Sequence, residues 1–92
     1  MKKSIKMIVN GTVQGVFFRQ FVKENADKMN VFGFVRNLIS GDVEIVAEGD
    51  GTALESFVRV IQKGPQHAMI KNVQVEEKKW TGEYKDFRVL RF

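Results

Sequence analysis

The sequence predicts an α+β domain in which two helices cover one face of an antiparallel sheet. Three observations lead to this prediction. Several segments alternate apolar and polar residues, two segments carry apolar residues at helical spacing, and glycine-containing turns separate them. A length of 92 residues suits one domain, so we expect residues 1–92 to fold as a single unit.

The first strand and the first helix are expected on either side of a glycine-flanked loop. Apolar residues alternate with polar ones from Ile5 to Val9, which is typical of a half-buried strand ending near residue 13. From Phe18 to Met29 the apolar residues recur every three or four positions. This spacing predicts a helix whose buried face includes Phe18.

A hairpin is expected in the middle of the chain. Residues 32–39 are rich in strand-forming residues, and "ISGD" at 39–42 has the composition of a tight turn. Apolar residues from Val43 to Ala47 then alternate with Glu44 and Glu48. This alternation predicts a second strand with one face in the core and both glutamates in water.

The second helix is bounded by recognisable start and stop signals. "TALE" at 52–55 has the form of a capping box, with Thr52 as the cap and Glu55 reaching back to it. An apolar stripe follows, and Gly64 and Pro65 predict where the helix ends.

Two further strands complete the chain. Val73 and Val75 mark a fourth strand, and residues 87–90 suggest a short fifth strand. The order is therefore β-α-β-β-α-β with a final strand. This is the split βαβ, ferredoxin-like plan, a sandwich of two helices on an antiparallel sheet.

Composition narrows the classes of function. The chain has no cysteine, which excludes disulfides and thiolate chemistry. No apolar run is long enough to span a bilayer, so we expect a cytoplasmic protein that does not enter membranes. Fifteen basic residues against 11 acidic ones give a net charge of +4, which favours anionic ligands.

The loop before the first helix is the main candidate for a binding site. Amide groups at a helix start carry partial positive charge, and a glycine-permitted turn can direct several of them into one concavity. Gly15 allows a ligand to approach the backbone, and Arg19 in the first turn can bind two oxygens of a phosphate. These features predict a cradle for phosphate or carboxylate, although many such loops only turn the chain.

Three segments resemble the acylphosphatase family. "GTVQGVFFR" at 11–19 is similar to the family signature, and "GFVRNLISGDVEIVAEG" at 33–49 is similar to its G-x-V-x-N segment and the following hairpin. "GPQHAMIKNV" at 64–73 resembles a third stretch, so the similarity spans nearly the whole chain. One departure is Ser40-Gly41 in the hairpin turn, where family members often have Asp-Gly.

The resemblance implies hydrolysis of the carboxyl–phosphate anhydride bond of acyl phosphates, giving a carboxylate and inorganic phosphate. It implies that Arg19 and Asn37 are catalytic, with Asn37 orienting the attacking water. It also implies no metal, no other cofactor and no covalent intermediate. The substrate would be a small acyl phosphate, with inorganic phosphate or a similar anion also bound in the loop, and the enzyme would be a monomer. The implied phosphate-binding residues are Gln14, Gly15, Val16, Phe17, Phe18 and Arg19.

Two other classes of function compete with this prediction. RNA-binding domains share the βαββαβ plan, and "VFGFV" at 31–35 echoes one of their motifs, but on the second strand rather than the third. The first strand also lacks an aromatic residue to stack on a base, so nucleic-acid binding is not expected. A non-catalytic anion-binding module is the other alternative. The lone His67 and the partly packed Trp80 are expected to be surface residues without a catalytic role.

Overall fold

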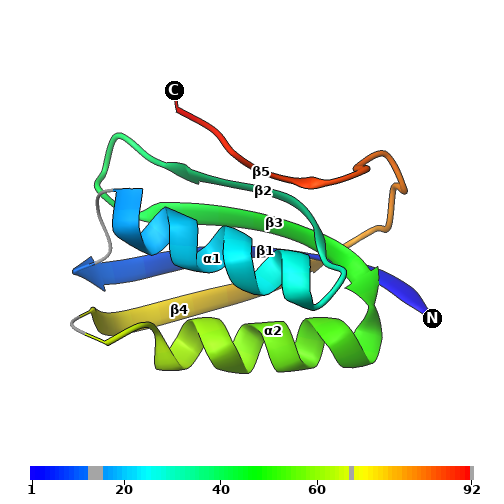
Figure 1. Cartoon of the computed structure of the whole chain (residues 1–92), viewed down its shortest axis with the longest axis horizontal. Helices are drawn as coiled ribbons and strands as arrows, with labels where there is room; N and C mark the ends of the chain where they lie inside the picture. The colour runs from blue at the N-terminus through cyan, green and yellow to red at the C-terminus, as the bar shows by residue number, and fades with distance from the viewer. Residues whose placement is uncertain (13–15, 67, 92) are drawn as a thin grey trace.

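The computed structural model describes residues 1–12, 16–66 and 68–91 of the chain. The helices and strands follow the predicted βαββαβ order with a fifth strand at the end (Figure 1). The elements are β1 (Lys2–Thr12), α1 (Val16–Lys28), β2 (Phe32–Asn37), β3 (Val43–Asp50), α2 (Gly51–Lys63), β4 (Met69–Lys78) and β5 (Phe87–Val89).

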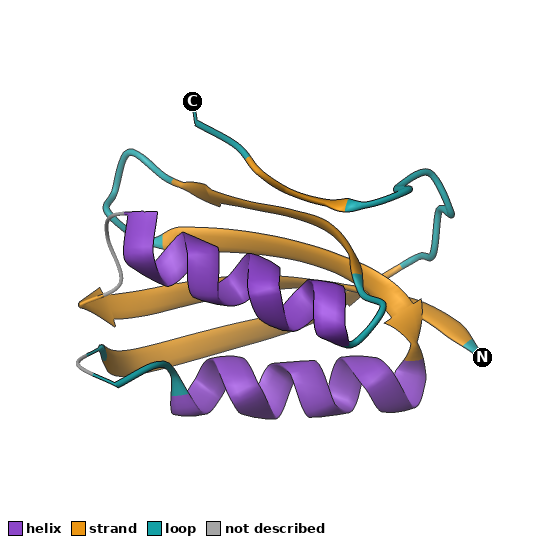
Figure 2. Cartoon of the chain, viewed as in Figure 1, coloured by secondary structure: helices purple, strands orange, loops and turns teal. Residues whose placement is uncertain are grey.

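The five strands form one sheet in the order β4-β1-β3-β2-β5, and both helices lie on the same face of it (Figure 2). The first four strands are antiparallel neighbours, as predicted. However, β5 pairs in parallel with β2, so the sheet is mixed rather than wholly antiparallel. The reason is topological. The chain leaves β4 at the end of the sheet where β2 begins, so a strand added beside β2 runs in the same direction.

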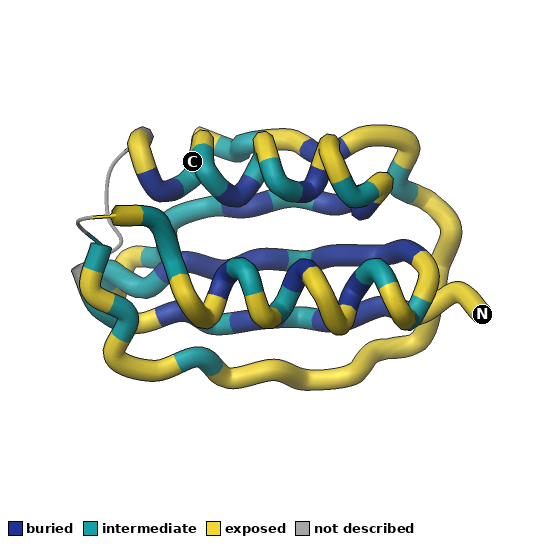
Figure 3. Tube along the Cα trace, turned by 60° about the horizontal axis from the view of Figure 1, so that its bottom comes forward, coloured by how far each residue is buried: buried dark blue, intermediate teal, exposed yellow. Residues whose placement is uncertain are grey.

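The core lies between the sheet and the two helices. Alternate residues of β3, from Val43 to Ala47, point toward the helices and are fully buried. Helix α1 contributes Phe18 to this layer, as predicted, and the ring of Phe57 in α2 meets Phe87 of β5 edge to face at 6.3 Å. Figure 3 shows the buried stripes on the helices facing the buried stripes on the strands.

Helix α2 begins earlier than the predicted capping box. The sequence predicted Thr52 as the N-cap with Glu55 reaching back, but Asp50 occupies the N-cap position and the helix starts at Gly51. Asp50 makes no side-chain capping hydrogen bond. Strand β3 stays paired with β1 as far as Lys2 opposite Asp50, so the helix follows the strand directly and Thr52 falls inside the first turn.

The end of α2 agrees with the prediction. Gly64 has φ +74°, a conformation that side chains other than glycine's rarely adopt, and its N–H donates to the carbonyl of Val60 at 3.0 Å. Pro65 follows, and because it lacks an N–H it cannot continue the helical hydrogen bonding.

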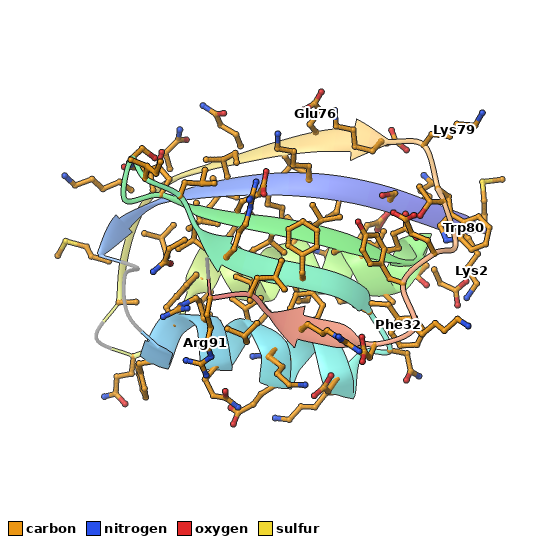
Figure 4. The ribbon with its side chains drawn as sticks, turned by 90° about the horizontal axis from the view of Figure 1, so that it is seen from above. Lys2, Phe32, Glu76, Lys79, Trp80 and Arg91 are labelled. Carbon is orange, nitrogen blue, oxygen red and sulfur yellow. The ribbon has the colours of Figure 1, made fainter. Side chains whose placement is uncertain are left out.

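The prediction that Glu44 and Glu48 lie in water is wrong. Both point to the face of the sheet away from the helices, yet they are only 7% and 3% exposed. The segment between β4 and β5 crosses over this face, as Figure 4 shows, and its residues Thr81 and Gly82 bond the Glu48 carboxylate. The alternation of apolar and polar residues in β3 assigned both glutamates to the correct face of the sheet, but it could not reveal that a later segment of the chain covers part of that face.

Candidate active site

The first turn of α1 lies at one end of the sheet (Figure 1). The helix begins at Val16, so the amides of Val16, Phe17 and Phe18 fall among those that have no carbonyl one turn earlier in the helix. The first turn contains no acidic residue, so its positive end is not neutralised from within. Gln14 and Gly15, the two other predicted members of the cradle, lie outside the described residues.

Packing of α1 fixes the direction in which its first turn points. Phe18 is buried in the core, and its ring lies 6.1 Å from the ring of Phe21 one turn later. Phe17 is 70% exposed at the start of the helix, directly after the loop. Burial of Phe18 therefore leaves Phe17 and Arg19 on either side of the packed face.

Asn37 points to the same side of the sheet as α1. Successive residues of a strand face opposite sides, and Val35 is fully buried toward the helices, so Asn37 faces the helices as well. It is the last residue of β2 and lies opposite Val43 in the hairpin. The predicted turn is closed by the Leu38 N–H, which donates to the Asp42 carbonyl at 2.8 Å.

Arg19 and Asn37, 18 positions apart in the sequence, line the same cavity. Its volume is about 300 Å³, and Leu90 and Arg91 are the other lining residues in the described part of the chain. A cavity of this size is at the lower end of the range for small-molecule sites. The structure therefore brings together the two residues that the sequence analysis marked as catalytic.

The side-chain oxygen of Asn37 is the chemically informative atom of this cavity. Oδ1 is buried, and within the described ranges it is the one buried side-chain nitrogen or oxygen without a hydrogen-bond partner. Most buried acceptors in proteins are satisfied, because a buried acceptor without a donor costs about 1–3 kcal/mol. A buried acceptor without a donor, in a cavity that also contains an arginine, is suited to a ligand that donates a hydrogen bond, such as water.

A hydrogen bond links the strand before the loop to the turn after Asn37. Asn10 Nδ2 donates to Asp42 Oδ1 at 2.7 Å, joining the end of β1 to the β2–β3 turn. The next residue, Gly11, has φ +143°, and a Cβ there would lie 2.1 Å from the carbonyl oxygen of Met69 in β4. Glycine is therefore required where β1 passes closely beside β4, just before the loop.

The sequence analysis did not identify Leu90 and Arg91 as part of the site. Leu90 was assigned to the fifth strand, whereas β5 ends at Val89. The Leu90 N–H instead donates to the carbonyl of Val35 at 2.9 Å, which brings the chain alongside the end of β2. The parallel pairing that places these residues depends on distant segments, and no local sequence signal indicates it.

Clusters of metal ligands and membrane-spanning helices are both absent from the described residues. Within residues 1–12, 16–66 and 68–91 no three His, Cys, Asp or Glu side chains gather as metal ligands would. None of the helices described is both long and apolar enough to cross a membrane. His67 lies outside the described residues, and Trp80 is 45% exposed, in agreement with its expected surface position.

Comparison with known proteins decides the family. The family model for acylphosphatase matches residues 5–89. The chain belongs to the acylphosphatase family. It is 47% identical over 90 residues to the acylphosphatase of Methanospirillum hungatei, covering 97% of this chain and 98% of that protein. It is 44% identical over 87 residues to the acylphosphatase of Rubrobacter xylanophilus, covering 95% and 79%.

The structural comparison leads to the same family. The crystal structure of acylphosphatase from Bacillus subtilis superposes with a TM-score of 0.91 at 38% identity, covering 98% of this chain and 99% of that one. The resemblance drawn from the three sequence segments is thereby confirmed, and the chain is an enzyme of the acylphosphatase type.

Proposed function

We propose that this chain, acting as one acylphosphatase-like domain over residues 1–92, hydrolyses the carboxyl–phosphate anhydride bond of acyl phosphates. The observation that carries the proposal is that Arg19 lines the same cavity as Asn37, whose Oδ1 has no hydrogen-bond partner among the described residues. The guanidinium of Arg19 can neutralise a phosphoryl oxygen, and Oδ1 of Asn37 can accept a hydrogen from water. Family membership supplies the reaction class.

The phosphoryl group is held by positive charge and backbone donors. In the proposed complex the guanidinium of Arg19 bonds two phosphoryl oxygens, and amides from Gln14 to Phe18 bond the others. The transition state of phosphoryl transfer is loose and its charge is spread over the equatorial oxygens, so positioning and neutralisation provide most of the catalysis.

Water attacks phosphorus directly, without a covalent enzyme intermediate. Asn37 Oδ1 accepts a hydrogen from the water and holds it in line with the bond that breaks. The leaving carboxylate needs no protonation at neutral pH, so no strong general acid is required. The proton of the water passes to a phosphoryl oxygen of the substrate, and a pH–rate profile that requires a protein base near neutrality would contradict this step.

The test is hydrolysis of benzoyl phosphate in the presence of a chelator. We expect wild-type turnover to persist without metal, and Arg19→Ala to lower kcat by about 100-fold or more, the usual effect of removing a transition-state donor. Asn37→Ala should lower kcat by about 100-fold, because the attacking water is no longer held in line. Arg88→Ala is the matched control, because Arg88 is exposed, pairs with Asp86 at 3.1 Å and lies outside the cavity. Circular dichroism establishes that each variant is folded.

Two outcomes would overturn the proposal. Folded wild-type protein that does not hydrolyse benzoyl phosphate would leave an anion-binding module, and salt-dependent binding of single-stranded RNA would then point to the other alternative class. Arg19→Ala or Asn37→Ala protein with wild-type kcat would show that the cavity is not where the reaction occurs.

A further inference from the structure

The chain after β5 forms a short arm that enters the proposed active site. The Leu90 N–H donates to the carbonyl of Val35, two residues before Asn37, and this bond sets the position of the arm along β2. Leu90 and Arg91 then line the cavity together with Arg19 and Asn37. Figure 4 labels Arg91 near the end of the chain, and its side chain is drawn in that view near the first turns of α1, with which it shares this cavity.

The cavity has room for more than a phosphoryl group. Arg19, Asn37 and the helix amides provide for the phosphate and the water, yet the volume of about 300 Å³ falls within the range that holds whole small molecules. Among the described residues, the remaining lining comes from the arm, where the apolar Leu90 lies next to the cationic Arg91. This pairing suits a carbon skeleton that carries a negative charge.

Among the described residues, no acidic side chain pairs with Arg91. Arg91 is exposed, and within the described part of the chain no carboxylate lies within ion-pair distance of it. Arg88, three residues earlier on the same segment, contrasts with it, because its Nε lies 3.1 Å and 3.2 Å from the two carboxylate oxygens of Asp86. Arg91 is therefore the arginine of this segment that is available to a ligand.

We propose that the Leu90–Arg91 arm is the subsite for the acyl half of the substrate, and that it favours acyl phosphates whose acyl group carries a second anionic group. This inference rests on the proposed function, since it assigns the phosphoryl group to Arg19. Leu90 contacts the carbon skeleton, and the guanidinium of Arg91 binds the carboxylate or phosphate beyond it.

The test compares two substrates that differ in one charge. Benzoyl phosphate and 4-carboxybenzoyl phosphate share the same ring and the same reacting bond, and the second adds a carboxylate at the far end. We expect Arg91→Gln to lower the ratio of kcat/KM, carboxylated over unsubstituted, by about tenfold, the effect of losing a charged hydrogen bond. Arg91→Lys should retain part of the preference, since it keeps the charge but loses the planar fork.

Arg88→Gln is the matched control, because it removes the same formal charge from the same segment without touching the cavity. Its substrate ratio should equal that of the wild type. Because the ratio is taken within one variant, a fraction of unfolded protein cancels from it. The inference is wrong if Arg91→Gln lowers kcat/KM equally for both substrates, or leaves both unchanged. Failure of the proposed function is a separate result, in which wild type hydrolyses neither substrate.

Discussion

The two faces of the sheet are stabilised by different interactions, apolar packing on one face and bonds to buried carboxylates on the other. The face toward the helices is packed with apolar side chains, and Ile45 at its centre is fully buried. The opposite face buries two carboxylates of the same strand, Glu44 and Glu48. Because burying a charge is costly without partners, each carboxylate on that face must be compensated by specific bonds, whereas the apolar face needs only close packing.

The two buried glutamates are compensated in different ways. Glu44 lies between two cations, with Arg36 Nε at 2.6 Å and Lys6 Nζ at 3.5 Å. Glu48 instead accepts three bonds from neutral donors, the N–H and hydroxyl of Thr81 at 3.0 and 2.8 Å and the N–H of Gly82 at 3.0 Å. One carboxylate is therefore held by charges on neighbouring strands, and the other anchors the segment that leads to β5.

Tyr84 of the same covering segment lies near Glu48. The ring of Tyr84 meets Phe34 of β2 edge to face at 6.0 Å. Burial raises the pKa of the Tyr84 hydroxyl above its ordinary value, and the nearby carboxylates of Glu83 and Glu48 add to the shift. Tyr84 therefore keeps its proton to a higher pH than an ordinary tyrosine, and like any tyrosine it adds no negative charge to this face at physiological pH.

The largest expected effect comes from breaking the apolar face. Phe57→Ala removes a fully buried ring that also packs against Phe87, so we expect a loss of about 3–5 kcal/mol in the free energy of unfolding. Urea denaturation measures it. Ile39→Ala, at a fully exposed position, should change stability by less than about 0.5 kcal/mol. A loss below 1 kcal/mol for Phe57→Ala would mean that the apolar layer is not the main source of stability.

A smaller effect is expected at Glu48. Glu48→Gln replaces one acceptor oxygen with an amide nitrogen, which then faces a donor from Thr81 or Gly82, so we expect a loss of about 1–3 kcal/mol. The loss should be nearly the same in low and high salt, because these donors are uncharged. Glu55→Gln on the exposed side of α2 is the control. Equal stability of Glu48→Gln and wild type would show that Glu48 does not anchor the covering segment.

The smallest effect is expected at Glu44. Glu44→Gln keeps an acceptor for Arg36 but removes the charge, and the loss should be about 1 kcal/mol at low salt, because the partner cations Arg36 and Lys6 remain 36% and 37% exposed to water. Salt screens the interactions with Arg36 and Lys6, so the difference from wild type should shrink as ionic strength rises. A loss that does not vary with salt would show that Glu44, like Glu48, acts through its hydrogen bonds alone.

Local sequence patterns predicted most of the helices and strands, but they did not predict every contact between them. The helix predicted from the spacing after Phe18 and the helix end predicted at Gly64 agree with the structure, because both follow from neighbours in the sequence. The capping box at Thr52 failed because the pairing of β3 with β1 carries the strand to Asp50. In that place a long-range sheet contact outweighed a local capping preference.

The residues of the candidate site divide in the same way into those that local sequence could identify and those that it could not. Arg19 and Asn37 could be selected from the sequence because each belongs to a recognisable segment, and the structure brings them to one cavity. Leu90 and Arg91 carry no such signal. They reach the cavity only because β5 adds in parallel to β2 and the Leu90 N–H bonds Val35.

By itself, the sequence determined the order of helices and strands, the face of each strand that enters the core, and the family. These properties follow from side-chain periodicity, turn residues and short motifs, all of which are local. Only the tertiary structure decided the parallel fifth strand, the burial of Glu44 and Glu48, and the arm beside Asn37. The fifth strand, the arm and the burial of Glu48 depend on where the segment after β4 crosses the sheet. The burial of Glu44 depends on Arg36 and Lys6 of neighbouring strands. All of these are contacts that no local pattern encodes, because they join separate segments of the chain.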